Sequence, residues 1–211
     1  MVGAHYDVYS DTPGSDDNAS GIAGILELAR ILSRENPKLD YRIDFVAYTL
    51  EEPPFFRTEN MGSAKHAQYL KENNINLIGM ISLEMIGFFS NKKNSQNYPI
   101  PLFKLFYPSE ANFIAIIGKF EKQSFVKKIK KNMLQNSDII VKSINAPNTI
   151  KGMDFSDHLN YWSQGYNAVM VTDSSFYRNP NYHLESDTFE KLNFEKMSEV
   201  IKGLYFAIIN Y

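Results

Sequence analysis

The chain begins MVGAHYDVYSDTPGSDDNASG, residues 1–21, and this stretch joins a strand, a turn and a helix. Residues 1–5 are mostly apolar and are typical of the end of a buried strand. Residues 13–18 form a tight acidic turn, after which Asn18 or Ser20 could cap a helix. The apolar face of that helix is predicted to comprise Ile22, Ile25, Leu26, Ala29 and Leu32.

Short strand-like runs and longer helical runs continue to alternate along the chain, which favours a three-layer α/β domain. A buried strand is expected at residues 43–50, and further strands are expected at residues 77–88, 113–118, 139–144 and 168–172. Helices are expected at residues 61–72, 155–164 and 194–209, and around Phe125, Ile129 and Met133. Residues 90–110 are rich in Asn, Ser, Pro and aromatic residues and are predicted to be a long loop, which in a compact domain is often functional.

Length and composition limit the class of protein. With 211 residues, 44% hydrophobic and 22% charged, the chain is predicted to form a single soluble domain over residues 1–211. Because the sequence starts on what looks like a strand end, we expect an N-terminal truncation. A net charge of -2 gives no support to nucleic-acid binding, and no apolar run reaches the ~20 residues of a membrane span. Without cysteine, a metal must be held by His, Asp and Glu, which suits zinc.

Polar side chains follow the ends of the predicted strands, the edge at which open α/β sheets bind ligands. They include His5, Asp16, Glu52, Glu84 and His183. Two imidazoles and three carboxylates could hold two zinc ions, with one carboxylate bridging them. Two Zn²⁺ bring four positive charges, three carboxylates remove three, and a bridging hydroxide, the nucleophile of such a site, would cancel the last.

Taken singly, most of these residues have an ordinary structural explanation. An acidic turn such as residues 15–18 is a common helix start, and adjacent glutamates are mostly solvated. Glu84 differs, because its apolar neighbours imply burial and a buried carboxylate without a partner is costly. A metal or another cation is therefore expected beside Glu84.

Taken together, the segments resemble the co-catalytic, two-zinc metallo-aminopeptidases, whose relatives include glutamate carboxypeptidases and glutaminyl cyclases. The segments that carry the resemblance occur in the family's order at residues 3–7, 13–21, 51–52, 61–63, 82–87, 182–183 and 187–188. Residues 156–158 resemble a further segment near the family's substrate pocket. The resemblance covers essentially the whole chain. It implies an α/β/α sandwich with a mostly parallel mixed central sheet, here lacking N-terminal strands.

The resemblance also implies a role for each residue of the site. His5 and Glu84 would bind one zinc ion, Glu52 and His183 the other, and Asp16 would bridge them. Glu51 would be the general base that takes a proton from the metal-bound water and passes it to the leaving amine. Asp7 would orient His5. The Asp16–Asp17 peptide bond is expected to be cis.

The implied activity is that of a zinc-dependent aminopeptidase, which hydrolyses the N-terminal peptide bond of peptides with a metal-bound hydroxide. Family habit favours a secreted or periplasmic location. Phe55, Phe56, Tyr161 and Trp162 are predicted pocket walls, whereas Asp157 and His158 are not first-choice ligands.

Two departures from the family pattern and three alternatives qualify this interpretation. Glu84 stands where many members have Asp, and residues 53–56, Pro-Pro-Phe-Phe, replace a stretch that often contains Gly. The alternatives are a glutaminyl cyclase-like transferase with one zinc, a non-catalytic peptide- or partner-binding relative, and carboxypeptidase specificity.

Overall fold

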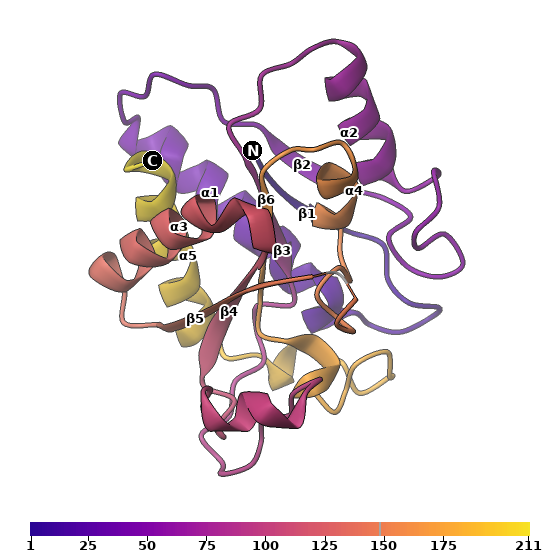
Figure 1. Cartoon of the computed structure of the whole chain (residues 1–211). Helices are drawn as coiled ribbons and strands as arrows, with labels where there is room; N and C mark the ends of the chain where they lie inside the picture. Colours follow the sequence, from indigo (N-terminus) through magenta and orange to yellow (C-terminus); the bar gives the residue numbers. More distant parts are fainter. Residues whose placement is uncertain (148) are drawn as a thin grey trace.

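The computed structural model describes residues 1–147 and 149–211, in which a six-stranded sheet lies between two layers of helices (Figure 1). The strands are β1 (Val2–His5), β2 (Phe45–Tyr48), β3 (Met80–Glu84), β4 (Phe113–Lys119), β5 (Ile140–Ala146) and β6 (Ala168–Thr172). Their order is β2-β1-β3-β6-β4-β5, and every pairing is parallel except that of β4 with β6. The predicted three-layer α/β/α sandwich with a mostly parallel mixed sheet is thus confirmed.

The helices divide between the two faces of the sheet, as Figure 1 shows. One face is covered by α1 (Gly21–Glu35), α3 (Gln123–Asn136) and α5 (Phe194–Ile209), and the other by α2 (Gly62–Glu72) and α4 (His158–Ser163). Shorter helical turns are η1 (Ser15–Ser20), η2 (Pro101–Leu105), η3 (Phe120–Lys122), η4 (Ser175–Tyr177) and η5 (Phe189–Lys191). Each face has its own apolar core because alternate strand residues point to opposite sides.

Four parallel neighbours, β2, β1, β3 and β6, direct their carboxyl ends to the same edge of the sheet. The chain therefore leaves β1 at His5 and β3 at Glu84 on that edge, and Glu51 follows β2 by three residues. Polar residues of the loops lie along this edge, whereas the helices bury the two faces of the sheet.

The strand at the start of the chain, β1, lies inside the sheet between β2 and β3. Two details of the following strand and helix differ from the expectation. The strand predicted to be buried at residues 43–50 is shorter, and β2 forms an edge with mostly half-buried side chains. Leu26 is 65% exposed, and Leu28 takes the inward position instead.

Among the helices of residues 1–147 and 149–211, none is both long enough and apolar enough to cross a bilayer.

Candidate metal centre

Two groups of ligand-type side chains converge at the carboxyl edge of the sheet. The inner position consists of His5, Asp17 and Glu84, all of them buried. His5 Nε2 lies 3.5 Å from Asp17 Oδ1 and 3.3 Å from Glu84 Oε2. These side chains come from β1, the turn of η1 and the end of β3, so the sheet itself sets most of their spacing.

The outer position consists of Asp17, Glu52 and His183. His183 Nε2 lies 3.2 Å from Asp17 Oδ2 and 3.3 Å from Glu52 Oε2. The His183 side chain is 20% exposed, whereas that of His5 is fully buried. The two positions therefore differ in depth while sharing one carboxylate.

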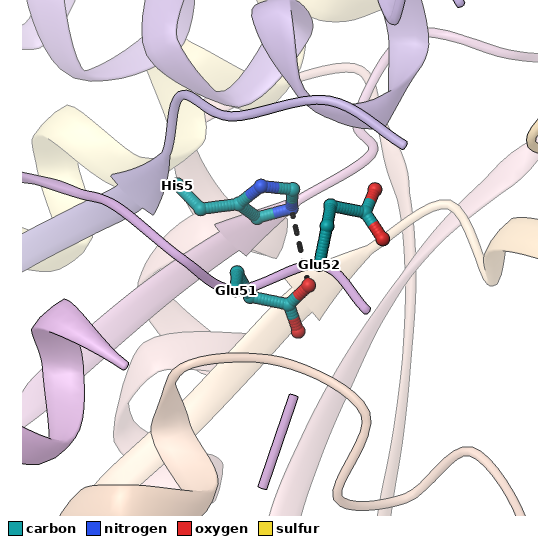
Figure 2. Close-up of side chains that lie close together, drawn as sticks. All are labelled: His5, Glu51 and Glu52. Atoms are coloured by element: carbon teal, nitrogen blue, oxygen red, sulfur yellow. Dashed lines mark ion pairs between the residues drawn. The ribbon is translucent and has the colours of Figure 1, made fainter. Parts of the chain in front are cut away.

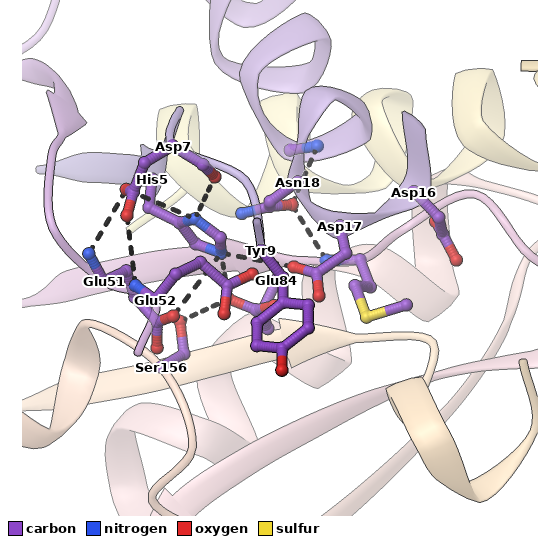
Figure 3. A network of polar contacts seen from close by, with 12 residues as sticks. His5, Asp7, Tyr9, Asp16, Asp17, Asn18, Glu51, Glu52, Glu84 and Ser156 are labelled. Carbon is purple, nitrogen blue, oxygen red and sulfur yellow. Dashed lines mark hydrogen bonds and ion pairs between the residues drawn. The ribbon is translucent and has the colours of Figure 1, made fainter. Parts of the chain in front are cut away.

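Asp17 is the shared residue, because each of its two oxygens faces a different histidine. The predicted bridging residue is Asp16, but the structure places the next residue, Asp17, between the two histidines. In Figure 3 the Asp16 side chain lies apart from the network around His5. Its carboxylate instead accepts hydrogen bonds from the Gly87 amide at 2.9 Å and the Asn179 side-chain amide at 2.7 Å.

The turn that aims Asp17 is held from the other end of the chain. The Asp187 carboxylate accepts hydrogen bonds from the backbone amides of Asp16 and Asp17 at 3.1–3.2 Å. The cis peptide bond of this turn joins Asp17 to Asn18, not Asp16 to Asp17 as expected. Two consecutive aspartates look equivalent in the sequence, and only the course of the backbone decides which one faces the histidines.

Glu51 and Glu52 leave β2 on a turn that Asp7 fixes. The Asp7 carboxylate accepts hydrogen bonds from the Glu51 and Glu52 amides at 3.2 and 3.1 Å. Asp7 also approaches His5, but the closer contact to Nδ1, at 3.0 Å, comes from the Asp7 backbone carbonyl and not from its carboxylate at 3.7 Å. This contact leaves Nε2 free to bind a ligand.

Glu51 occupies a separate place beside the inner position. Figure 2 shows its carboxylate pointing toward His5, and Oε2 lies 3.9 Å from His5 Nε2. His5, Glu51 and Glu52 could themselves form a third group of metal ligands. In the two groups around Asp17, however, Glu51 has no part, and its carboxylate stays close but separate.

Several supporting residues were not singled out from the sequence. Ser156 donates a hydrogen bond of 2.7 Å to Glu84 Oε2, which fixes that carboxylate in the inner position. His183 is stacked between Tyr9 and Tyr182, with ring centroids 4.0 and 3.7 Å away. Ser156 lies in a segment that the resemblance had marked, whereas no sequence signal pairs Tyr9 with residues more than 170 positions later.

The cluster attracts positive charge strongly. Burial alone would lower the pKa of His183, but the neighbouring carboxylates of Asp17 and Glu52 raise it to about 9. Burial likewise opposes protonation of His5, yet the charges of Glu84 and Glu51 bring its pKa well above the ordinary value. Burial raises the pKa of Glu84 to about 7, against the effect of His5. Carboxylates this crowded favour a bound cation.

The donor atoms fit zinc. Within the described chain, His5 Nε2, His183 Nε2 and Glu52 Oε1 are buried and have no hydrogen-bond partner. With zinc–ligand distances of about 2.0–2.1 Å, ligand atoms of a tetrahedral site lie about 3.3 Å apart. The four histidine–carboxylate separations of 3.2–3.5 Å within the two positions agree with this spacing. Nitrogen and oxygen donors without thiolate suit zinc.

A cavity of about 220 Å³ opens beside the cluster. Of the predicted pocket walls, Phe56 lines it, whereas Tyr161 and Trp162 of α4 are buried in the core and do not. Phe55 points outward and is 37% exposed. His158 is buried, its Nε2 lies 2.9 Å from the Met153 carbonyl, and it joins neither position.

Comparison with known proteins gives a consistent picture. Residues 1–207 match peptidase family M28. The uncharacterized protein YfbL of Escherichia coli strain K12 is 47% identical over 218 aligned residues, which cover all of this chain and 66% of YfbL. The fold is similar to that of BSAP, a zinc aminopeptidase from Bacillus subtilis, with a TM-score of 0.73 and 22% identity, over 99% of this chain and 45% of BSAP.

A second structural relative has a different activity. The glutaminyl cyclase of Fimbriiglobus ruber aligns with a TM-score of 0.66 and 18% identity, over all of this chain and 70% of the cyclase. At such identities the likeness shows the shared fold. The chain spans less than two thirds of the length of YfbL and about half that of the aminopeptidase.

Proposed function

The chain belongs to peptidase family M28, and from this premise we propose that it is a two-zinc aminopeptidase that removes the N-terminal residue of peptides. The observation that carries the proposal is Asp17, whose two oxygens face two different histidines at 3.5 and 3.2 Å. A carboxylate shared in this way is suited to bridging two metal ions. His5 and Glu84 would complete one zinc site, and Glu52 and His183 the other.

When bound, a pair of zinc ions polarises a carbonyl and lowers the pKa of water, which is the chemistry that peptide hydrolysis requires. The protein itself must supply the group that transfers the proton. Glu51 lies next to the inner position without belonging to either group around Asp17. Burial raises its pKa well above the ordinary value, so its carboxylate can accept a proton from the attacking water and release it to the departing amine.

The proposed exopeptidase specificity rests on charge. Two zinc ions would neutralise the three carboxylates that bind them, so the charge that suits the free α-amine of a peptide is that of Glu51, which belongs to neither group around Asp17. The adjoining cavity is lined mainly by apolar and aromatic side chains. A peptide whose amine is blocked would lose that attraction. N-acetylated substrates are therefore expected to be cleaved poorly.

The test compares wild type with Glu51→Gln after loading with zinc. We expect two zinc ions in both proteins, with hydrolysis of aminoacyl substrates reduced by about 10³-fold or more in the variant, because it cannot accept the proton. Glu59→Gln is the matched control, since Glu59 is exposed on the same loop. Metal is measured by atomic emission and activity by product release.

Each alternative result has a separate meaning. Full activity of Glu51→Gln would refute the proposed role of Glu51 as the general base. One zinc per chain together with cyclisation of N-terminal glutamine would favour a glutaminyl cyclase. Faster cleavage of N-acetylated peptides than of free ones would refute the aminopeptidase specificity.

A further inference from the structure

The cavity beside the metal centre extends along the sheet toward a positive charge. Its floor contains Thr172 of β6, Ala115 of β4 and Lys142 of β5. Ala115 is paired with both Thr172 and Lys142, and Thr172 is paired with Glu84. Glu84 of the inner position and Lys142 therefore stand at the two ends of one row across four strands, on the same face of the sheet.

The row has a length that suits a peptide. Three interstrand steps of about 4.8 Å separate the Cα atoms of Glu84 and Lys142 by about 14 Å. Both side chains shorten this gap, and a peptide advances about 3.3–3.6 Å per residue. The space between them thus fits one or two residues of a substrate. The small side chains of Thr172 and Ala115 keep the middle of the row open.

The surroundings of Lys142 are otherwise apolar. The neighbouring row of the floor is Met170, Ile117 and Ile144, and aromatic rings of Tyr98, Phe103 and Tyr107 lie over it. This aromatic roof belongs to the loop at residues 90–110, and it is tied to the strand of Lys142 by a hydrogen bond from the Tyr107 hydroxyl to the Ser143 carbonyl at 3.1 Å. Lys142 is thereby positioned at the far end of a covered pocket.

The charge of Lys142 is not balanced by the protein. Among the described residues, no carboxylate forms an ion pair with it. The acidic residues that line the cavity are all in the metal cluster at the opposite end. An anion between the roof and β5 would relieve this imbalance.

We propose that Lys142 binds a carboxylate of the substrate, so that the preferred substrates are short peptides with a negative charge within reach of Lys142. This inference rests on the proposed peptidase function. The carboxylate has two possible sources: the acidic side chain of the first residue or the free C-terminus of a very short peptide. Either would lie with its apolar part against the aromatic roof and its charge at Lys142.

Two pairs of peptides separate the sources. Ala-Phe and Ala-Phe-amide differ in the C-terminal carboxylate, and Glu-Phe-amide and Gln-Phe-amide differ in the first side chain. For the zinc-loaded wild type, we expect kcat/KM to be higher by about tenfold or more for the charged member of one pair. The difference should lie mainly in KM, because only the charged peptide can form a charge-assisted hydrogen bond with Lys142. The pair that shows the preference identifies the source.

The variant Lys142→Met should abolish that preference while cleaving the neutral peptides within about threefold of wild type. Lys142→Arg should restore most of it, because the charge is kept. Lys127→Met is the matched control, since Lys127 is exposed on α3 across the sheet. An unchanged preference in Lys142→Met, or an equal loss on charged and neutral peptides, would overturn the proposal.

A failure of the proposed function would look different. If the wild type cleaves none of the four peptides, calorimetry with Ala-Phe, Glu-Phe-amide and their neutral partners tests the same inference without catalysis. Tighter binding of a charged peptide by wild type than by Lys142→Met would support the carboxylate site. Equal binding by both proteins would refute it.

Discussion

The inner and outer positions of the metal centre are built by different means, although they share Asp17. In the inner position, His5 ends a strand in the middle of the sheet, and Glu84 ends the next strand and is held by Ser156. In the outer position, His183 belongs to a loop, is partly exposed and is held by stacked tyrosine rings. Backbone pairing orients one histidine and side-chain packing orients the other. We therefore expect the outer metal to be the more easily disturbed.

Substitution of Asp17, the carboxylate that the two positions share, is expected to have the largest effect on metal binding and activity. Asp17→Ala removes a ligand from both positions, so we expect binding of both zinc ions to weaken and hydrolysis to fall by about 10³-fold or more, because the metals supply the Lewis-acid chemistry. Asp16→Asn is the matched control, since Asp16 faces Gly87 and Asn179 and its amide replacement keeps a similar shape. Zinc per chain and kcat/KM are measured for both.

The two aspartate variants also decide between the two assignments of the bridge. If Asp16→Asn lost both metals while Asp17→Ala kept them, the geometry derived from the structure would be wrong. Thermal unfolding of each variant shows whether a loss of metal results from a loss of fold.

The fold could be predicted well from the sequence where one pattern determined the result. The strand at Ala168–Thr172 and the helix at Phe194–Ile209 have the predicted bounds, because each is a clear apolar pattern ended by polar residues. The prediction that the strand at residues 43–50 is buried was wrong. An edge strand such as β2 can have the same apolar run as a central strand. Strand order depends on long-range pairing, which no local pattern contains.

The site was only partly predictable for a similar reason. The ordered segments locate His5, Glu52, Glu84 and His183, and the structure places these side chains in the two positions. Asp16 and Asp17 are adjacent and chemically identical, so their roles depend on backbone torsions that the sequence does not specify. The contribution of Tyr9 depends on two loops meeting in space, which the sequence also leaves open.

The pH dependence of stability measures how strongly each position holds protons when metal is absent. His183 has a pKa of about 9 in the fold against about 6.5 when unfolded, so between these values the folded state binds more protons. The stability that this proton provides is complete below about pH 6.5 and is lost as the pH rises through about 9. We expect the free energy of unfolding in chelator to fall from pH 7 to 9.5.

The contribution of His183 can be isolated in the same experiment. His183→Ala should flatten the decline in stability, and the slope that remains would belong to the other groups of the cluster whose pKa is raised, such as His5 and Glu51. Urea unfolding at four pH values checks this. The zinc-loaded protein should show a smaller decline, because the metal replaces the protons. A variant with the full wild-type slope would show that His183 does not carry the effect.

The smallest expected effect concerns the stacking that holds the outer histidine. Tyr9 lies parallel to His183, with ring centroids 4.0 Å apart and an interplanar angle of 2°. Tyr9→Leu removes this contact, worth about 0.5–1.5 kcal/mol, so the affinity for the outer zinc should fall by about 2–12-fold while the inner zinc is unaffected. Tyr6→Leu is the control, since Tyr6 is 57% exposed. Stepwise zinc titration against a competing chelator resolves the two affinities. Equal weakening of both would mean that stacking supports the shared carboxylate as well, and the distinction between the two positions would then lie in their depth alone.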